Sequence, residues 1–218
     1  AVWDYRGLPH NFHGQICPQY FCGWLFIALL AVFLDDGLRF LALSAVIAAL
    51  YAVLTYAAAA MNLAFGAVQF RFSEALTVLP AFTPAAIPGL AVGCLISNLA
   101  SPLGVVDWVF GTLATLLAGI FSYLVRNIRW KEIPVLAPLP PVIFNALIVG
   151  CEVACLADNG TFAFGNLSLA GFIAGAVSVG IGELVVCYVL GVPLMMALRR
   201  MGYPVRDSVY TLEQGRAE

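Results

Sequence analysis

The sequence predicts an all-α integral membrane protein, a bundle of six helices preceded by one extra N-terminal transmembrane helix. Of the 218 residues, 62% are hydrophobic and only 10% are charged. The mean hydropathy is +0.97. Long apolar runs recur along the chain, and about 20 helical residues suffice to cross a hydrocarbon core of ~30 Å. A soluble hydrophobic core does not explain this pattern.

Seven apolar runs follow one another along the chain: 16–34, 38–60, 74–82, 85–100, 105–125, 134–156 and 167–198. Most of them are long enough to span a bilayer as helices. The run 74–82 is too short to cross alone, and Pro84 and Pro88 follow directly after it. We therefore expect a short helix tucked in before the next span. Such a break at membrane depth must be buried in protein or line a cavity.

The positions of basic residues predict the orientation, because cytoplasmic loops hold an excess of arginine and lysine. The stretch RNIRWK at 126–131 joins two spans, and RRMGYPVR follows the last span from Arg199. Both are placed in the cytoplasm, together with the C-terminus. The predicted organisation is an extra segment with one span at 1–38, a six-helix domain at 39–200 and a polar cytoplasmic tail at 201–218.

Several classes of function do not fit the sequence. Its single lysine, Lys131, excludes the GxxxxGK[ST] motif for ATP binding, so any ATP would be used by a partner. It has no HExxH or GxSxG motif, and we expect no catalytic residues and no enzyme. No metal site is expected, because His10 and His13 form a loop pair without a third ligand and the cysteines lack zinc-ligand spacing. No basic stripe suggests nucleic acid.

Polar residues inside the spans are the candidates for a binding site, because an ionisable residue at membrane depth costs about 2.5 to 3.5 kcal/mol on insertion scales. The substrate-binding candidates are Arg71, Glu74, Asn98, Asp107, Trp108, Asn145, Glu152 and Glu183. Asn145 and Glu152 lie seven residues apart and so share one helix face. Few basic residues are present to neutralise these carboxylates, which suggests a ligand that donates protons or brings positive charge.

Each candidate also has a purely structural interpretation. Glu74 follows Ser73 in the first turn of the expected short helix, where the helix dipole favours an acidic residue. Arg71 could simply pair with Glu74. The other polar residues could be interfacial caps, hydrogen bonds between helices or buried pairs.

Small residues spaced four apart predict close contacts between helices in lipid. Two such pairs lie in one alanine-rich run: Ala45 with Ala49 and Ala48 with Ala52. A glycine-rich stretch at 171–182 has the same spacing and is expected to pack inside the bundle. For the alanine pairs, an external partner is an equally good interpretation.

Four long stretches resemble one transporter family: AALYAVLT, VQFRFSEALTVLPAFTPAAIPGLAVGCLISN, GVVDWVFGTLATLLAG and LAPLPPVIFNALIVG. From about 39 to 200 the chain is similar to the QueT family, the queuosine-precursor substrate-binding (S) components of energy-coupling-factor (ECF) transporters of the bacterial cell membrane. The segment before residue 39 resembles instead the end of a different bacterial permease family.

The resemblance implies a six-helix bundle that captures a 7-deazaguanine outside the cell and docks on a membrane partner, the T component. Two cytoplasmic ATPases on that partner would use the ATP, and this chain would need no cofactor. It also implies that an alanine stripe, either Ala45/Ala49 or Ala48/Ala52, contacts the T component.

The implied ligand presents a ring N–H beside an exocyclic amine, which one carboxylate can accept together. An aminomethyl substituent would add a cation for a second carboxylate. Asn98 or Asn145 could read the ring carbonyl, and Phe70, Phe72 or Trp108 could stack on the ring. The alternatives are an S component for another vitamin-like solute and a membrane assembly protein without a transport function.

Overall fold

The computed structural model describes the backbone of residues 18–64, 69–129, 133–156 and 162–203, and the side chains of these residues from residue 36 onward. Within these ranges the chain is helical and has no strand, although an isolated antiparallel bridge joins Leu156 and Phe162. Contacts divide the chain into two units, Ala1–Phe40 and Leu41–Glu218. The candidate site belongs to the second unit.

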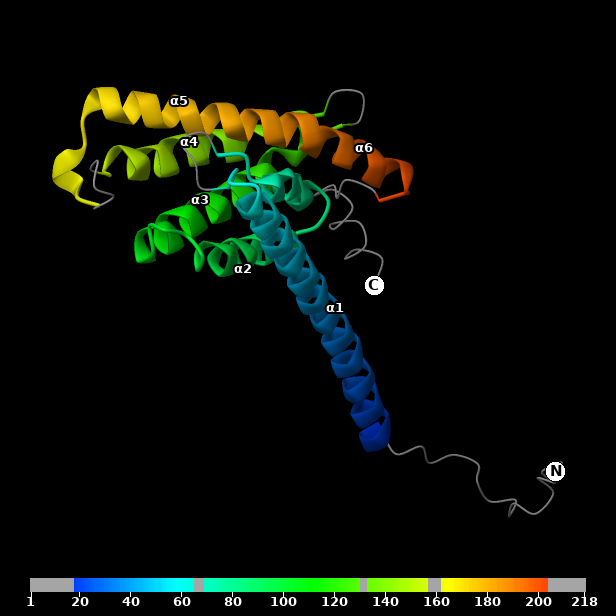
Figure 1. Ribbon diagram of the computed structural model, residues 1–218. Helices are drawn as coiled ribbons and strands as arrows, with labels where there is room; N and C mark the ends of the chain where they lie inside the picture. Colours follow the sequence, from blue (N-terminus) through cyan, green and yellow to red (C-terminus); the bar gives the residue numbers. More distant parts are fainter. Residues whose placement is uncertain (1–17, 65–68, 130–132, 157–161, 204–218) are drawn as a thin grey trace, which may run out of the picture. The chain divides into compact units, whose positions relative to one another are not determined.

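The described residues form α-helices connected by shorter 3₁₀ and π-helical segments. In chain order they are α1 (Pro18–Ala60), η1 (Phe72–Ala81), α2 (Ala86–Asn98), α3 (Val105–Leu124), η2 (Val125–Asn127), α4 (Leu139–Ala154), η3 (Phe164–Asn166), α5 (Leu169–Val185), η4 (Val186–Gly191) and α6 (Val192–Arg200). The helices α5, η4 and α6 follow one another without a gap (Figure 1).

Three described stretches are long and apolar enough to cross a membrane: Asp36–Ala60, Val105–Asn127 and Leu169–Arg200. Two shorter apolar helices, α2 and α4, accompany them. These lengths and compositions confirm the predicted all-α membrane fold.

The loop expected between the first two apolar runs is absent, because α1 is helical from Pro18 to Ala60. No proline lies inside this range after its first residue, and the glycine between the two apolar runs is Gly37. An isolated glycine inside a helix costs only about 1 kcal/mol relative to alanine and does not end it. The side chains of the expected first span, up to residue 35, lie outside the described ones, so that span stays a prediction.

The short helix expected before the next span is confirmed as η1, a 3₁₀ helix of ten residues. Pro80 lies within it, and a proline cannot supply the N–H that a longer helix needs. Its buried residues are Ser73, Glu74, Ala75, Leu76, Thr77, Val78, Pro80 and Ala81. The segment packs against α3 and η4. The irregular backbone is therefore enclosed by protein, and η1 carries Glu74 into the interior.

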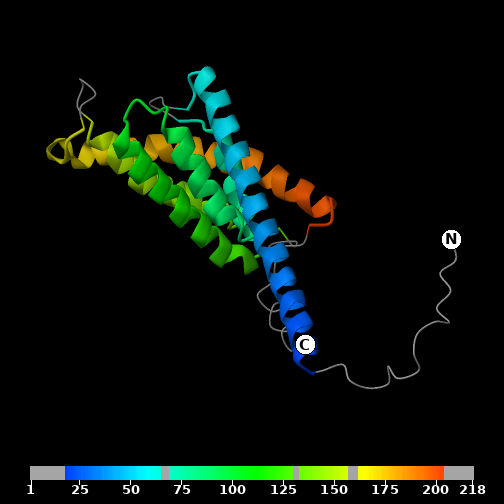
Figure 2. The same ribbon diagram turned by 90° about the horizontal axis from the view of Figure 1, so that it is seen from below.

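Glycines bring α4 and α5 into close contact, and the two helices lie side by side (Figure 2). A Cβ on Gly150 would lie 2.7 Å from the Ala176 Cα, and one on Gly175 would lie 2.6 Å from the Gly150 carbonyl oxygen. Real Cβ atoms do not approach backbone so closely. Gly175 thus packs inside the bundle, as the sequence predicts for this stretch.

The second half of α1 packs against α2 in the same way. A Cβ on Gly93 would lie 2.8 Å from both the Ala48 carbonyl oxygen and the Tyr51 Cβ. The Ser44 hydroxyl donates to the Ala85 carbonyl at 2.8 Å. This contact places Tyr51 in the main hydrophobic cluster, next to η1.

Candidate ligand-binding site

The structure buries most of the predicted site residues in one neighbourhood. The buried ones are Arg71, Glu74, Asn98, Asp107, Asn145, Glu152 and Glu183. Trp108, Phe70 and Phe72, the candidates for ring stacking, are half-buried. The buried residues come from η1 and the residue before it, the end of α2, the start of α3, the middle and last turn of α4, and the last turn of α5.

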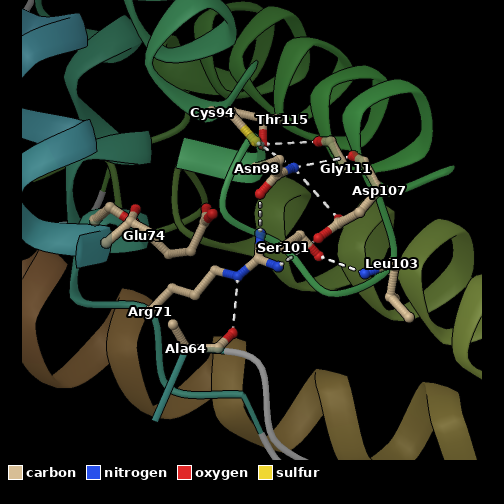
Figure 3. A network of polar contacts seen from close by, with 12 residues as sticks. Ala64, Arg71, Glu74, Cys94, Asn98, Ser101, Leu103, Asp107, Gly111 and Thr115 are labelled. Atoms are coloured by element: carbon tan, nitrogen blue, oxygen red, sulfur yellow. Dashed lines mark hydrogen bonds and ion pairs between the residues drawn. The ribbon is translucent and has the colours of Figure 1, made fainter. Parts of the chain in front are cut away.

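Arg71 is the centre of this neighbourhood, and its guanidinium is held by separate elements. Nε donates to the Ala64 carbonyl at 3.1 Å, Nη1 donates to Asn98 Oδ1 at 3.3 Å, and Nη2 lies 3.4 Å from Asp107 Oδ2 (Figure 3). The Arg71 and Asp107 side chains are 5% and 2% exposed. The interpretation that paired Arg71 with Glu74 is revised, because the ion pair joins Arg71 to Asp107, and Glu74 is an electrostatic neighbour.

Asn98 and Asp107 reach Arg71 because a glycine leaves room for them. Asn98 Nδ2 donates to the Asp107 carbonyl at 2.9 Å and to Oδ1 at 3.3 Å. A Cβ on Gly111 would lie 2.5 Å from Asn98 Nδ2 and 2.7 Å from Asp107 Oδ1. Both side chains are buried within this network, so neither is a cap at the water interface.

Glu74 is oriented by a residue from α1. The Tyr51 hydroxyl donates to Glu74 Oε1, and both side chains are buried. The other carboxylate oxygen, Oε2, has no hydrogen-bond partner among the described residues. Glu74 lies in the first turn of η1, as the helix-dipole interpretation expects, and its hydrogen-bonded oxygen serves Tyr51.

The facing sides of α3 and α4 carry further buried polar atoms without partners in the described part of the chain. They are Trp108 Nε1, Thr112 Oγ1, Asn145 Nδ2 and both carboxylate oxygens of Glu152. Trp108 and Thr112 are four residues apart on α3, which packs directly against α4. Leaving a buried polar group unpaired costs about 1–3 kcal/mol. Several such atoms together indicate a missing partner, such as a ligand or water.

Glu183 connects α5 to this group of residues. Its Oε2 accepts from the Cys187 thiol at 3.6 Å, and the same sulfur lies 3.6 Å from the Glu74 carbonyl oxygen. Asn145 lies near the Glu183 carboxyl, and the charges of Glu74 and Arg71 are its electrostatic neighbours. Cys187 is in the π-helical segment η4, and π-helical turns occur frequently at functional sites.

Acidic groups outnumber basic ones around Arg71. Glu74, Glu152 and Glu183 all have the Arg71 charge as a neighbour, but the guanidinium is hydrogen-bonded to Asp107. The arrangement therefore offers carboxylate oxygens to a ligand rich in N–H donors. Among the described residues, no group of three or more histidine, cysteine or acidic residues could hold a metal ion. His10 and His13 lie outside the described residues.

Three polar residues of the site were not identified from the sequence: Tyr51, Thr112 and Cys187. Each lies four residues from another polar residue or site residue on the same helix face: Tyr51 from Thr55, Thr112 from Trp108, and Cys187 from Glu183. That spacing is the signal that could have revealed them, because residues four apart in a helix are neighbours.

The structure separates the two alanine pairs. Ala48 and Ala52 are buried within the chain, whereas Ala45 and Ala49 are exposed. Of the two pairs, Ala45 and Ala49 are therefore the one whose small side chains lie on the surface of α1.

The QueT transporter family model matches residues 41–200. The queuosine precursor transporter QueT of Lactococcus lactis subsp. cremoris is 38% identical over 88 residues, which are 40% of this chain and 51% of that protein. The chain thus spans about half the length of this curated relative. No solved structure matches.

Proposed function

Because the chain belongs to the QueT transporter family, we propose that it is the substrate-binding membrane subunit of an ECF-type importer and captures a 7-deazaguanine precursor of queuosine. The family match includes every residue of the candidate site. The relative from Lactococcus lactis, named as a queuosine precursor transporter, supports this substrate class.

The observation that carries the proposal is the set of buried, unpaired donors and acceptors. A 7-deazaguanine ring presents a carbonyl, a ring N–H and an exocyclic amine along one edge. Glu152 and Glu74 supply unpaired carboxylate oxygens for the donors, and Trp108 supplies an unpaired N–H for the carbonyl. The Asn145 amide, which lies near the Glu183 carboxyl and makes no hydrogen bond of regular geometry, is a second N–H donor. A structural assembly protein has no use for such atoms, because each one destabilises the fold unless it is paired.

The proposal includes a T component and two cytoplasmic ATPases. A nucleotide-binding motif of the P-loop type is impossible here, because the single lysine, Lys131, is followed by Glu132. We place the C-terminal end of α6, with Arg199 and Arg200, in the cytoplasm. The exposed Ala45 and Ala49 would allow another helix to approach α1 closely.

The proposal is tested by ligand-dependent thermal unfolding of the purified chain in detergent. A ligand that binds only the folded state stabilises it by RT ln(1 + [L]/Kd), about 2.7 kcal/mol at a hundredfold excess over Kd. The panel contains 7-aminomethyl- and 7-cyano-7-deazaguanine beside riboflavin, thiamine and biotin. We expect stabilisation by the deazaguanines alone. Stabilisation by a vitamin instead would identify a different solute, and stabilisation by none would favour an assembly protein.

A further inference from the structure

The two carboxyl groups with unpaired oxygens, Glu74 and Glu152, differ in what they can still accept. Glu152 has two oxygens without a hydrogen-bond partner among the described residues, whereas Glu74 has one, because Tyr51 already donates to the other. Both side chains are 2% exposed. Glu152 can therefore accept two donors at once, and Glu74 can accept one.

The charges around the two groups also differ. The charge of Glu183 is a neighbour of Glu74, and Cys187 contacts both the Glu183 carboxylate and the Glu74 backbone carbonyl. The acidic neighbour of Glu152 is Asp107, which is already paired with Arg71. Glu74 and Glu183 thus form an acidic pair whose cationic neighbour in the described part of the chain, Arg71, is already paired with Asp107.

The two donor groups of a 7-aminomethyl-7-deazaguanine require different acceptors. The ring N–H and exocyclic amine are parallel donors in one plane, a geometry that both oxygens of one carboxylate match. The adjacent ring carbonyl needs an N–H donor. Trp108, next to Asp107 in the sequence, has an unpaired N–H, and so does Asn145, two turns before Glu152 on the same helix face. A protonated amine is a compact charge with three donors, which single oxygens of different groups can accept.

The following inference rests on the proposed function. We propose a division of roles, in which Glu152 accepts the paired donors of the ring edge and Glu74 binds the amino substituent of the ligand. Tyr51 positions Glu74 by occupying its second oxygen. Glu183 acts behind Glu74 as a second acidic group that favours a cation there. The site therefore selects a precursor that carries an amine over one that carries a neutral substituent.

Calorimetric titration of the full chain with three probes tests this assignment. The probes are 7-aminomethyl-7-deazaguanine, 7-methyl-7-deazaguanine, which lacks the substituent amine, and 7-aminomethyl-7-deazahypoxanthine, which lacks the ring amine. Glu152→Gln should weaken the first two probes equally, about tenfold to a hundredfold, and the third much less. Glu74→Gln should weaken both aminomethyl probes by a similar factor and the methyl probe less than about threefold.

Two further variants complete the test, one for the role of Glu183 and one for the case that Glu152→Gln does not fold. Glu183→Gln should reduce affinity for the aminomethyl probes alone. If Glu152→Gln does not fold, Glu152→Asp keeps the carboxylate and displaces it, so it should weaken both deazaguanines and spare the hypoxanthine probe. The reverse pattern, or equal losses for all probes, would overturn the assignment while leaving the proposed substrate class intact. Absence of binding to the wild-type chain would instead overturn the proposed function, and the assignment with it.

Discussion

The guanidinium of Arg71 lies 3.4 Å from the carboxylate of Asp107 although the two residues are 36 positions apart in the sequence. The pair ties the residue before η1 to the first turn of α3. Asn98, at the end of α2, bonds to both partners. Three elements of the site thus depend on one buried ion pair.

Breaking this pair should destabilise the protein strongly. Asp107→Asn leaves the buried guanidinium without its charged partner, and such losses lower the free energy of unfolding by about 3–5 kcal/mol. Thermal unfolding in detergent measures the effect, with the exposed Val109→Ala on the same helix as the control. An unchanged unfolding temperature for Asp107→Asn would show that the pair does not hold these elements together.

Gly111→Ala should disturb the same network by steric contact. Its added Cβ would lie 2.5 Å from Asn98 Nδ2 and 2.7 Å from Asp107 Oδ1, so both side chains must move away from Arg71. Gly119→Ala on the same helix is the matched control, because its Cβ would lie 3.7 Å from the Pro80 Cγ, an ordinary contact. We expect weaker ligand binding and a lower unfolding temperature for the first variant only. Equal behaviour of the two variants would contradict the claim that Gly111 leaves the room that Asn98 and Asp107 need.

Tyr51→Phe should weaken ligand binding without loosening the core. The ring that packs against α2 stays, but Glu74 Oε1 loses the hydrogen bond that orients the carboxylate. A hydrogen bond to a charged group contributes about 1.5–3 kcal/mol, so affinity should fall by about tenfold or more. The control is Tyr56→Phe, whose hydroxyl donates to the Ile96 carbonyl at 2.9 Å on the exposed face. If both variants bind as the wild type does, Tyr51 does not position Glu74.

Ala49→Trp should abolish co-purification with the T component and leave ligand binding unchanged, because close helix contact requires small side chains. Ala48→Trp should behave differently. Ala48 is buried and faces Gly93, so its replacement should lower the stability of the chain itself, since overpacking costs about 1–3 kcal/mol. Full recovery of the complex with Ala49→Trp would remove this face from the interface.

The sequence predicted the parts of the fold that depend on composition and on helix-breaking residues such as proline. Apolar length identified the membrane helices, and the short run 74–82 with Pro84 and Pro88 after it identified the short segment η1. The interruption between the apolar runs 16–34 and 38–60 is not a loop, because charged residues and one glycine do not by themselves end a helix. The structure therefore has one long helix, α1, at this place.

For the candidate site, the sequence pointed to polar residues that the structure buries, but it did not give their partners. A single sequence indicates polar residues on a helix face, yet it does not reveal contacts between distant positions such as Arg71 with Asp107 or Tyr51 with Glu74. It offered Glu74 as a possible partner of Arg71 because nearness along the chain was the only available guide. Tyr51 and Thr112 were missed because single hydroxyl groups in apolar runs carry no charge to signal their burial.

The most direct test of the account is calorimetric titration of the full chain with 7-aminomethyl-7-deazaguanine. The Glu74→Gln/Glu152→Gln double variant is compared with the wild type, and unfolding of both proteins confirms that they are folded. We predict binding of one ligand per wild-type chain and a loss of affinity of about a hundredfold or more in the double variant, because both free carboxylate acceptors are removed. Equal affinity in the folded double variant would contradict the claim that these buried, unpaired carboxylates form the ligand site.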